Sequence, residues 1–524
     1  MPRRRQILAA LPMLAVPAIA KAQSSSVLRF VPRYGLATLD PVFTTDQVTR
    51  IFGLAVFESL YATDETLRPR PMMAEGHTVD QDGKRWTITL RPGLRFHDGE
   101  PVQARDCVAS IQRWMKRDLL ARGLAPRLDS VEATDDRTIV FRLKQPFQRL
   151  DFALGKPLPN ILPIMPERLA ATDATKALPE IIGSGPFRLD PGSFSPGNAV
   201  ALARFDRYQP RSEPPNGMAG GRIAYLERVE WRALPDPATP ANALMTGEVD
   251  WVDLPLPDLV PRLKSHRGVA VGRADPFGTY AMLRMNHLQG PTANKAIRQA
   301  IMAAINPLEV MQSVVGDDAS MYTVPVGLFI PEGSAATDAG FARLGGNKSV
   351  ADVKAMLHAA GYKGERLVGL HAADNSFAHA VMPVVTARLR DVGMNVDDVT
   401  LDQGTVTQRR NSKEPLDKGG WSFFPQNPSG ADHLDPLVAL GIRTGAAAWV
   451  GWPDNKRIED LRAAWIDATD AEEQVRIARD LQAEALEEVV YAPLGRYFQP
   501  TAWRSNITGI LRTTVPVFWN VKKV

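Results

Sequence analysis

The chain has 524 residues, of which 44% are hydrophobic and 23% are charged. This balance is typical of globular proteins and excludes an intrinsically disordered chain, a coiled-coil rod and a multispan membrane protein. At about 100–200 residues per domain, the length predicts about two to four domains with a substantial buried core.

The first 22 residues have the features of a secretory signal peptide. Arg3 to Arg5 precede an apolar stretch, Ile7 to Ala20, which two prolines interrupt. Ala20-Lys21-Ala22 then offers small residues at the two positions that a signal peptidase reads. The stretch is too short to span a bilayer, and the alternative is a frayed N-terminal helix. Arg4-Arg5 leaves open whether the Sec or the twin-arginine (Tat) pathway exports the chain.

Cleavage of this leader changes the charge of the chain. The net charge of the whole chain is +4, but the leader holds four basic residues and no acid, which leaves 58 basic and 58 acidic residues. A neutral mature chain has no overall electrostatic reason to bind nucleic acid or an anionic membrane.

Cys107 is the only cysteine, so no intramolecular disulfide can form and no cysteine follows the leader to carry a lipid. We therefore expect a periplasmic protein that is not a lipoprotein.

The first third of the mature chain alternates between strand and helix patterns. Apolar and polar residues alternate in the predicted strands, whereas apolar residues recur three or four positions apart in the predicted helices. The patterns make residues 62–180 an α+β unit inserted in a larger domain. The predicted elements are strands over Val27–Val31, Trp86–Leu90 and Ile139–Leu143 and helices over Thr44–Tyr61 and Ala104–Lys116.

The remaining two thirds continue this alternation. The strongest helix pattern runs from Ile297 to Ile305, and Pro307 follows shortly after its end. Thr469-Asp470-Ala471-Glu472 resembles a capping box that opens a long helix, in which Val475 and Leu481 face the core. Further predicted elements are strand Tyr225–Leu234, helix Ala238–Thr246 with Gly247 as its C-cap, strand Glu248–Leu254, helices Val350–Ala360 and Ala380–Val392, and strand Met394–Leu401.

The sequence contains no catalytic or phosphate-binding signature. There is no G-x-S-x-G elbow, no H-E-x-x-H, no phosphate loop and no C-x-x-C. Cys107 lies in a predicted helix, where a small buried hydrophobe is the expected role. The spacing of His371 and His379 does not match a metal pair on one helical face, and His433 is the best single candidate ligand. We expect no metal site and no cofactor.

Aromatic residues gather in glycine-flanked loops and predict an apolar pocket with a few polar anchors. Packing between lobes is an equally good interpretation of each of them. The candidate pocket walls are Tyr34, Tyr280, Trp421, Phe424 and Trp449, and the candidate polar anchors are Asp432 and Arg443.

Seven sequence blocks resemble one family, the extracellular solute-binding proteins, family 5, of ABC importers for peptides, nickel and opines. The most specific block is Leu90 to Val102, LRPGLRFHDGEPV, which is similar to the family signature LRPGVKFHDGxP. The blocks occur in the family's order and cover nearly the whole mature chain. The other six are Phe57–Tyr61, Gly183–Phe187, Gly247–Asp250, Ile297–Ile301, Leu357–Tyr362 and Leu389–Val396.

The resemblance implies an α/β fold of the bilobal periplasmic-binding-protein type, in its large, three-domain type II variety. Two crossing strands join the lobes, by analogy Tyr280–Asn286 and Val489–Tyr497, and the ligand is enclosed on hinge closure. The resemblance also implies a monomer that delivers its ligand to an ABC permease without making or breaking a bond. The implied division is a signal peptide 1–22, lobe I over 23–61, 181–280 and 490–524, an inserted subdomain of lobe I over 62–180, and lobe II over 281–489.

The chain departs from the family at the residues that imply the ligand. Dipeptide- and oligopeptide-binding relatives carry an aspartate shortly after a tryptophan, but Trp421 is followed by Ser-Phe-Phe-Pro. The arginine that holds the ligand carboxylate in dipeptide-binding relatives is missing from His371 to Asp374. A buried charge without its partner costs several kcal/mol, so a zwitterionic dipeptide is disfavoured. An apolar, modified or differently charged solute fits better, unless Asp432 or Arg443 replaces the missing partner.

Two other functions stay open from the sequence. One is an exported hydrolase on an unrelated α/β fold. The other is the same binding fold carrying a metal chelate or haem.

Overall fold

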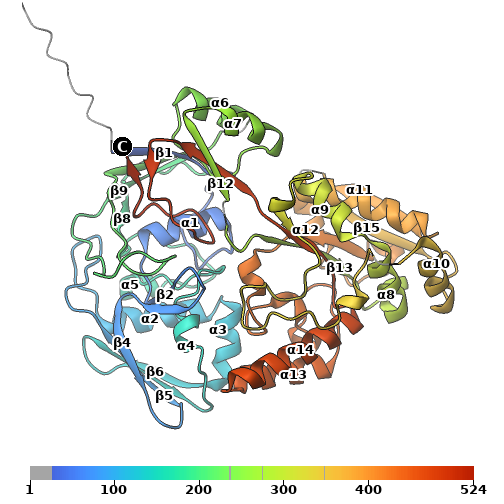
Figure 1. The fold of residues 1–524 in the computed structure, drawn as a ribbon. Helices are drawn as coiled ribbons and strands as arrows, with labels where there is room; N and C mark the ends of the chain where they lie inside the picture. Colours follow the sequence, from blue (N-terminus) through green and yellow to red (C-terminus); the bar gives the residue numbers. More distant parts are fainter. Residues whose placement is uncertain (1–25, 235, 237, 274, 347, 374) are drawn as a thin grey trace, which may run out of the picture.

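The structure, a computed structural model, describes residues 26–524 apart from positions 235, 237, 274, 347 and 374. The predicted signal peptide lies outside the described residues. Two large sheets organise the described chain into two lobes, and a smaller sheet lies beside the first lobe (Figure 1).

The first lobe is built on a seven-stranded sheet with β1 (Val27–Val31) at its centre. Phe30 on β1 packs edge-on against Trp231, Trp251 and Phe518, with ring centroids 5.1–5.5 Å apart. All four rings are buried, so the centre of this sheet is a core of aromatic residues. The strand order is β12 (Val269–Arg273), β19 (Pro500–Arg504), β11 (Trp251–Val252), β1, β10 (Arg228–Arg232), β9 (Ala199–Arg204) and β8 (Phe187–Leu189).

The second lobe is built on a six-stranded sheet covered by helices α8 to α11 (Figure 1). The strand order is β14 (Tyr322–Thr323), β18 (Ala492–Tyr497), β13 (Thr279–Met285), β17 (Phe423–Gln426), β15 (Arg366–Ala372) and β16 (Asn395–Leu401). The helices are α8 (Lys295–Ala304), α9 (Pro307–Val315), α10 (Val350–Ala359), α11 (Ser376–Asp391), α12 (Gln403–Arg409), α13 (Lys456–Asp467) and α14 (Ala471–Glu488).

The chain passes between the two large sheets twice, from β12 to β13 and back from β18 to β19. The segments predicted to cross, Tyr280–Asn286 and Val489–Tyr497, instead contribute β13 and β18 to the second sheet. The passages therefore lie just before the first segment and just after the second. Two nearby passages between otherwise separate sheets are the arrangement that permits hinge motion.

Residues 62–180 contain the smaller sheet, which is antiparallel and has the order β4 (Ala74–Val79), β5 (Arg85–Leu90), β7 (Thr138–Leu143) and β6 (Leu128–Ala133). Helix α2 (Ala104–Met115) packs on this sheet and buries Cys107 completely. Burial raises the pKa of the Cys107 thiol, which suits a packing role rather than a nucleophile.

The shorter elements of the chain are α1 (Gln47–Val56), β2 (Tyr61–Thr63), β3 (Pro69–Pro71), α3 (Leu119–Leu124), α4 (Leu150–Ala153), α5 (Glu167–Ala170), α6 (Thr239–Thr246), α7 (Val260–Ser265), β20 (Ile507–Thr508) and β21 (Lys522–Lys523).

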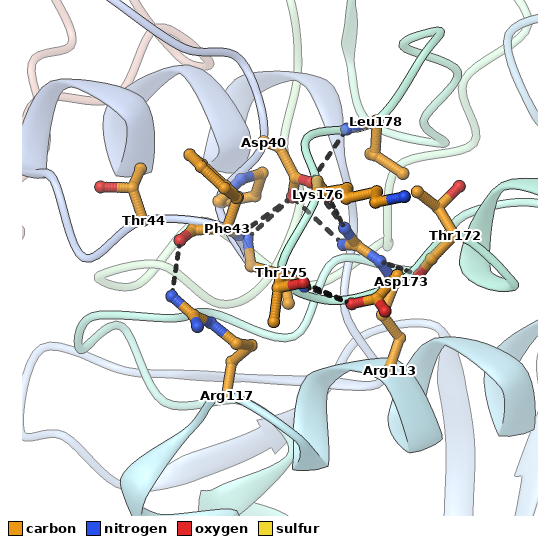
Figure 2. Close-up of polar contacts among 12 residues, drawn as sticks. Asp40, Phe43, Thr44, Arg113, Arg117, Thr172, Asp173, Thr175, Lys176 and Leu178 are labelled. Carbon is orange, nitrogen blue, oxygen red and sulfur yellow. Dashed lines mark hydrogen bonds and ion pairs between the residues drawn. The ribbon is translucent and has the colours of Figure 1, made fainter.

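A buried ion pair fastens α2 to the loop that precedes α1 (Figure 2). Arg113 donates to both carboxylate oxygens of Asp40, at 3.2 and 2.7 Å, and both side chains are 1% exposed. The same carboxylate accepts from the backbone N–H groups of Val42, Phe43 and Leu178. Asp40 therefore holds together three segments that are distant in the sequence.

Two of the family-like sequence blocks contact each other through His97. Its Nδ1 accepts from the N–H of Gly183 at 3.2 Å and its Nε2 donates to the carbonyl of Gly185 at 3.1 Å. Burial lowers the pKa of His97 to about 4, so the neutral ring that this pattern requires persists at neutral pH. The most specific block of the sequence thus has a packing role.

Several helix limits differ from those predicted: α1 covers Gln47–Val56 rather than Thr44–Tyr61, and α11 begins at Ser376 rather than at Ala380. Pro307 follows the end of α8 at Ala304, as predicted, and it also begins α9, because proline lacks an N–H and its fixed φ suits a first helical position. Helix α14 is capped by Asp470, which accepts from the N–H of Glu473, and not by Thr469. Val475 is 46% exposed, whereas Leu481 on α14 is buried. The prediction that Val475 faces the core was therefore wrong, and the buried face of α14 begins at Ile477 and Ala478.

Candidate functional site

Two adjoining cavities, with volumes of about 350 and 490 Å³, lie where the two lobes meet. Thr45 from the first lobe and Gln426 from the second line both of them. We call the first the apolar cavity because aliphatic and aromatic residues dominate its lining: Leu120, Leu158, Pro159, Met282, Pro428, Val438, Leu440 and Trp449. We call the second the polar cavity because amides and hydroxyls surround it: Tyr34, Thr45, Asn375, Gln403, Thr407, Gln426 and Asn427.

On the first-lobe side, the apolar cavity is lined by an ion pair, Lys156 with Asp118, that has no net charge. Lys156 Nζ lies 2.8 Å from Asp118 Oδ2, and both side chains are nearly buried. Lys156 also donates to the carbonyl of Pro159 at 2.6 Å. Because these partners satisfy the ammonium group, Lys156 is a wall residue rather than a free cation.

Arg443 is a less completely satisfied cation on the second-lobe side of the apolar cavity. Its Nη2 donates to the carbonyl of Leu437 at 3.2 Å, but its buried Nε has no hydrogen-bond partner among the described residues. Burial, together with the positive charge of Arg462, lowers the pKa of Arg443 to about 10. The side chain stays charged at neutral pH and has a donor to offer.

Two acids and an arginine cluster beside the passage between the lobes. Burial raises the pKa of Asp432, and Arg50 and Lys156 offset this only in part. Burial also raises the pKa of Asp275 to about 7, although Phe277 N–H and Ser429 Oγ donate to its carboxylate at 2.8 and 3.2 Å. The Nε of Arg50 is buried without a hydrogen-bond partner in the described structure. The three charged groups come from different segments: Arg50 from α1, Asp275 from the passage between the lobes, and Asp432 from the second lobe.

Arg410, at the end of α12, lines the polar cavity. Its guanidinium carbon lies 5.3 Å from the ring centroid of Trp449 and 5.8 Å from that of Phe424, and its Nη1 donates to Gln426 Oε1 at 3.2 Å. Trp449 in turn is held by the fully buried Arg284, which donates to the carbonyls of Trp449 and Val450. Arginine thus positions the aromatic wall between the two cavities.

Five of the seven predicted site residues line these cavities. Asp432, Arg443 and Trp449 line the apolar cavity, and Tyr34 and Phe424 line the polar cavity. The structure therefore brings together residues that are up to 415 positions apart in the sequence. Whether they contact a solute stays a prediction.

The other two predicted residues lie behind the walls. Tyr280 is fully buried, donates to the carbonyl of Phe329 at 2.9 Å and stacks on His433, which does line the apolar cavity. Trp421 is fully buried and packs against Phe424 and Trp452. Their side chains fill the core of the second lobe, Tyr280 from β13 and Trp421 from the residues just before β17.

Sequence reasoning missed most of the cavity lining, including the polar residues Asp118, Lys156, Arg410 and Gln426. None of these four residues belongs to a motif. Arg410 follows Arg409 in a polar segment, a pattern typical of the solvent-exposed end of a helix. Only the packing of distant segments turns these side chains toward the solute space.

The described residues contain no group of three or more histidine, cysteine or acidic side chains arranged to hold a metal ion. His371 and His379 do lie close, with ring centroids 5.7 Å apart, and His371 Nδ1 is 3.5 Å from Asp398 Oδ1. Across the part of the chain that the structure describes, no helix is both long enough and apolar enough to cross a bilayer.

Comparison with known proteins gives consistent results. The model of the family "Bacterial extracellular solute-binding proteins, family 5 Middle" matches residues 68–440. A probable peptide ABC transporter periplasmic-binding protein, y4tO of Sinorhizobium fredii, is 35% identical over 98% of both chains. The glutathione-binding protein GsiB of Salmonella typhi is 25% identical over 96% of this chain and 93% of its own.

Solved structures share the fold at lower identity. The periplasmic binding protein AgaA in complex with agropinic acid, from A.tumefacien R10, has a TM-score of 0.78 and 22% identity, covering 95% of this chain and 99% of its own. DppA from Helicobacter pylori, in complex with peptide STSA, has a TM-score of 0.76 and 21% identity, covering 95% and 98%. These neighbours confirm the expected bilobal α/β fold.

Proposed function

The chain belongs to family 5 of the bacterial extracellular solute-binding proteins, and from this premise we propose that its two cavities capture one small organic solute between the lobes for delivery to an ABC permease. The observation that carries the proposal is the position of the cavities, which residues of both lobes line. A solute that contacts both lobes stabilises the closed form, because only that form makes all of its contacts.

The solute we propose is peptide-like or another small organic molecule of similar size. Support comes from the relative named for peptides and from the glutathione-binding relative. In this chain, Asp432 and Arg443 line the apolar cavity as an acid and a base, and the Nε of Arg443 has no hydrogen-bond partner among the described residues. They are the candidates to replace the ligand-binding residues that the sequence lacks.

We further propose that the chain works as a monomer in the periplasm and that residues 1–22 direct its export by Sec or Tat without a lipid anchor. The name of the relative from Sinorhizobium fredii supports the periplasmic location. The solute leaves chemically unchanged, in keeping with a family of solute-binding proteins rather than enzymes.

The first experiment is native mass spectrometry of the mature protein purified without refolding. The proposal expects one solute per chain, either a ladder of peptide masses or one discrete mass. Recovery of an altered solute after incubation would contradict the proposal and favour the exported hydrolase. A retained metal or a visible absorption band would favour the metal-chelate or haem alternative.

The second experiment is small-angle X-ray scattering with and without the released solute. If the lobes close on one bound molecule, the protein should have a smaller radius of gyration with solute than without it. The solute concentration should stay constant over time, because the protein does not consume the solute. An unchanged radius together with consumption of the solute would overturn the capture role.

A further inference from the structure

The polar cavity contains one charged side chain. Among the described residues that line it, only Arg410 is ionised at neutral pH, and the others are amides, hydroxyls and apolar groups. The space therefore has a positive potential that no lining carboxylate cancels.

Arg410 has no ionic partner within the described chain. No described carboxylate lies within 4.0 Å of its guanidinium, whereas Arg388, on α11, pairs with Glu309. The Nε of Arg410 is buried and has no hydrogen-bond partner among the described residues, and the guanidinium makes one side-chain hydrogen bond there, to the amide of Gln426. Burial lowers the pKa of Arg410, and no neighbouring acid opposes this effect.

The surroundings hold Arg410 in place for a planar anion. The ring centroids of Trp449 and Phe424 lie within 6 Å of the guanidinium carbon, which restricts the orientation of the guanidinium group. Gln426 and Thr407 line the same cavity and supply further polar groups. A fixed, partly desolvated guanidinium beside neutral donors is the usual arrangement for binding an oxyanion.

We propose that the polar cavity receives an oxyanion group of the solute, a carboxylate or a phosphate, and that Arg410 is its counter-ion. The rest of the solute then extends past Gln426 and Trp449 into the apolar cavity. The inference rests on the capture function proposed above and narrows it to acidic solutes.

The test uses matched pairs of probes that differ in one anionic group. The pairs are N-acetyl-trialanine and its C-terminal amide, succinamate and succinamide, and glycerol 3-phosphate and glycerol. Binding to the mature protein is measured by isothermal titration calorimetry. We expect at least one acid to bind about 30-fold or more tightly than its uncharged partner, and the pair that responds distinguishes carboxylate from phosphate.

Three variants locate the effect. R410Q should abolish the preference for the acid, and R410K, which keeps the charge, should retain part of it. The matched control is R409Q, because Arg409 ends the same helix but donates to the carbonyls of Gly419 and Gly420, outside the cavities. This control should keep the full preference. The unfolding temperature of each variant without solute checks that it folds.

Equal binding of acid and uncharged partner, or a preference that survives in R410Q, would overturn the inference. If only uncharged or cationic solutes bind, the role of Arg410 fails while the capture function stands. If no probe binds and no solute is purified with the protein, both proposals fail.

Discussion

Asp275 carries a charge that depends on pH near neutrality. Its carboxyl has a folded-state pKa of about 7, raised by burial from an ordinary value of 3.8. A raised acid pKa stabilises the fold at low pH, and this stabilisation is lost as the pH rises through 7. We expect the free energy of unfolding to fall by about 2 kcal/mol between pH 5 and 8, because about two pH units of the shift lie in this range and the side chain keeps some contact with solvent.

Chemical denaturation at several pH values measures this slope. Asp275→Asn should flatten it in part, since Asp432 beside it also has a raised pKa. Asp417→Asn, a change at an exposed acid, serves as the control and should leave the slope as it is in the wild type. A slope that is unchanged in Asp275→Asn would contradict the assignment.

Trp421 and Trp449 are a matched pair that separates packing from binding. Trp421 is fully buried, so Trp421→Ala should lower the free energy of unfolding of the solute-free protein by about 3 kcal/mol. Trp449 lines the apolar cavity, so Trp449→Ala should mainly weaken solute binding, by about 10-fold. Thermal unfolding and calorimetry of both variants measure the two effects. The reverse pattern would place Trp421, and not Trp449, against the solute.

At the scale of elements, the buried ion pair between Asp40 and Arg113 joins helix α2 to the segment that precedes α1 (Figure 2). Asp40→Asn leaves the guanidinium of Arg113 buried without a counter-charge, which should cost about 3–5 kcal/mol of unfolding free energy. Glu132→Gln breaks the pair between the exposed side chains of Glu132 on β6 and Arg142 on β7 and should cost less than about 1 kcal/mol. Urea denaturation compares the two, and equal losses would show that burial does not decide the cost.

The local sequence predicted the limits of a helix or strand well where a capping residue or a regular apolar pattern within the element sets them. The strand Val27–Val31 has the predicted limits, and the helix predicted over Val350–Ala360 differs by one residue, because Ser349 supplies a standard N-cap. The strand predicted over Glu248–Leu254 shrinks to Trp251–Val252, since only these residues find partners on β1 and β19. Strand length depends on neighbours that the local sequence does not contain.

The site was predictable only in part for the same reason. Aromatic residues in glycine-flanked loops led to Trp449 and Phe424, but the identical signal led to Trp421, which faces the core. Arg410 carries no sequence signal, because its role depends on how α12 packs against the loop that holds Trp449.

At the scale of the whole molecule, two ion pairs connect residues 62–180 with the second lobe. Arg149 lies 2.9 Å from Asp435, which is fully buried, and Arg127 lies 2.7 Å from Asp467, which is largely exposed. Because hinge opening separates both pairs, each favours the form in which the lobes touch. The pair with the buried aspartate should matter more, since solvent screens the other.

Arg149→Gln should therefore shift the molecule toward an open form. The Asp435 carboxylate keeps the N–H donors of Leu437 and Val438 within its own lobe, so the lobe itself should stay folded. We expect about a 10-fold loss of affinity for the solute that is purified with the protein, and a larger radius of gyration in its absence. Arg127→Gln should change the affinity less than about 3-fold. Equal effects of the two variants would mean that the lobes are held by their apolar contacts, and that closure depends on the solute rather than on the ion pairs.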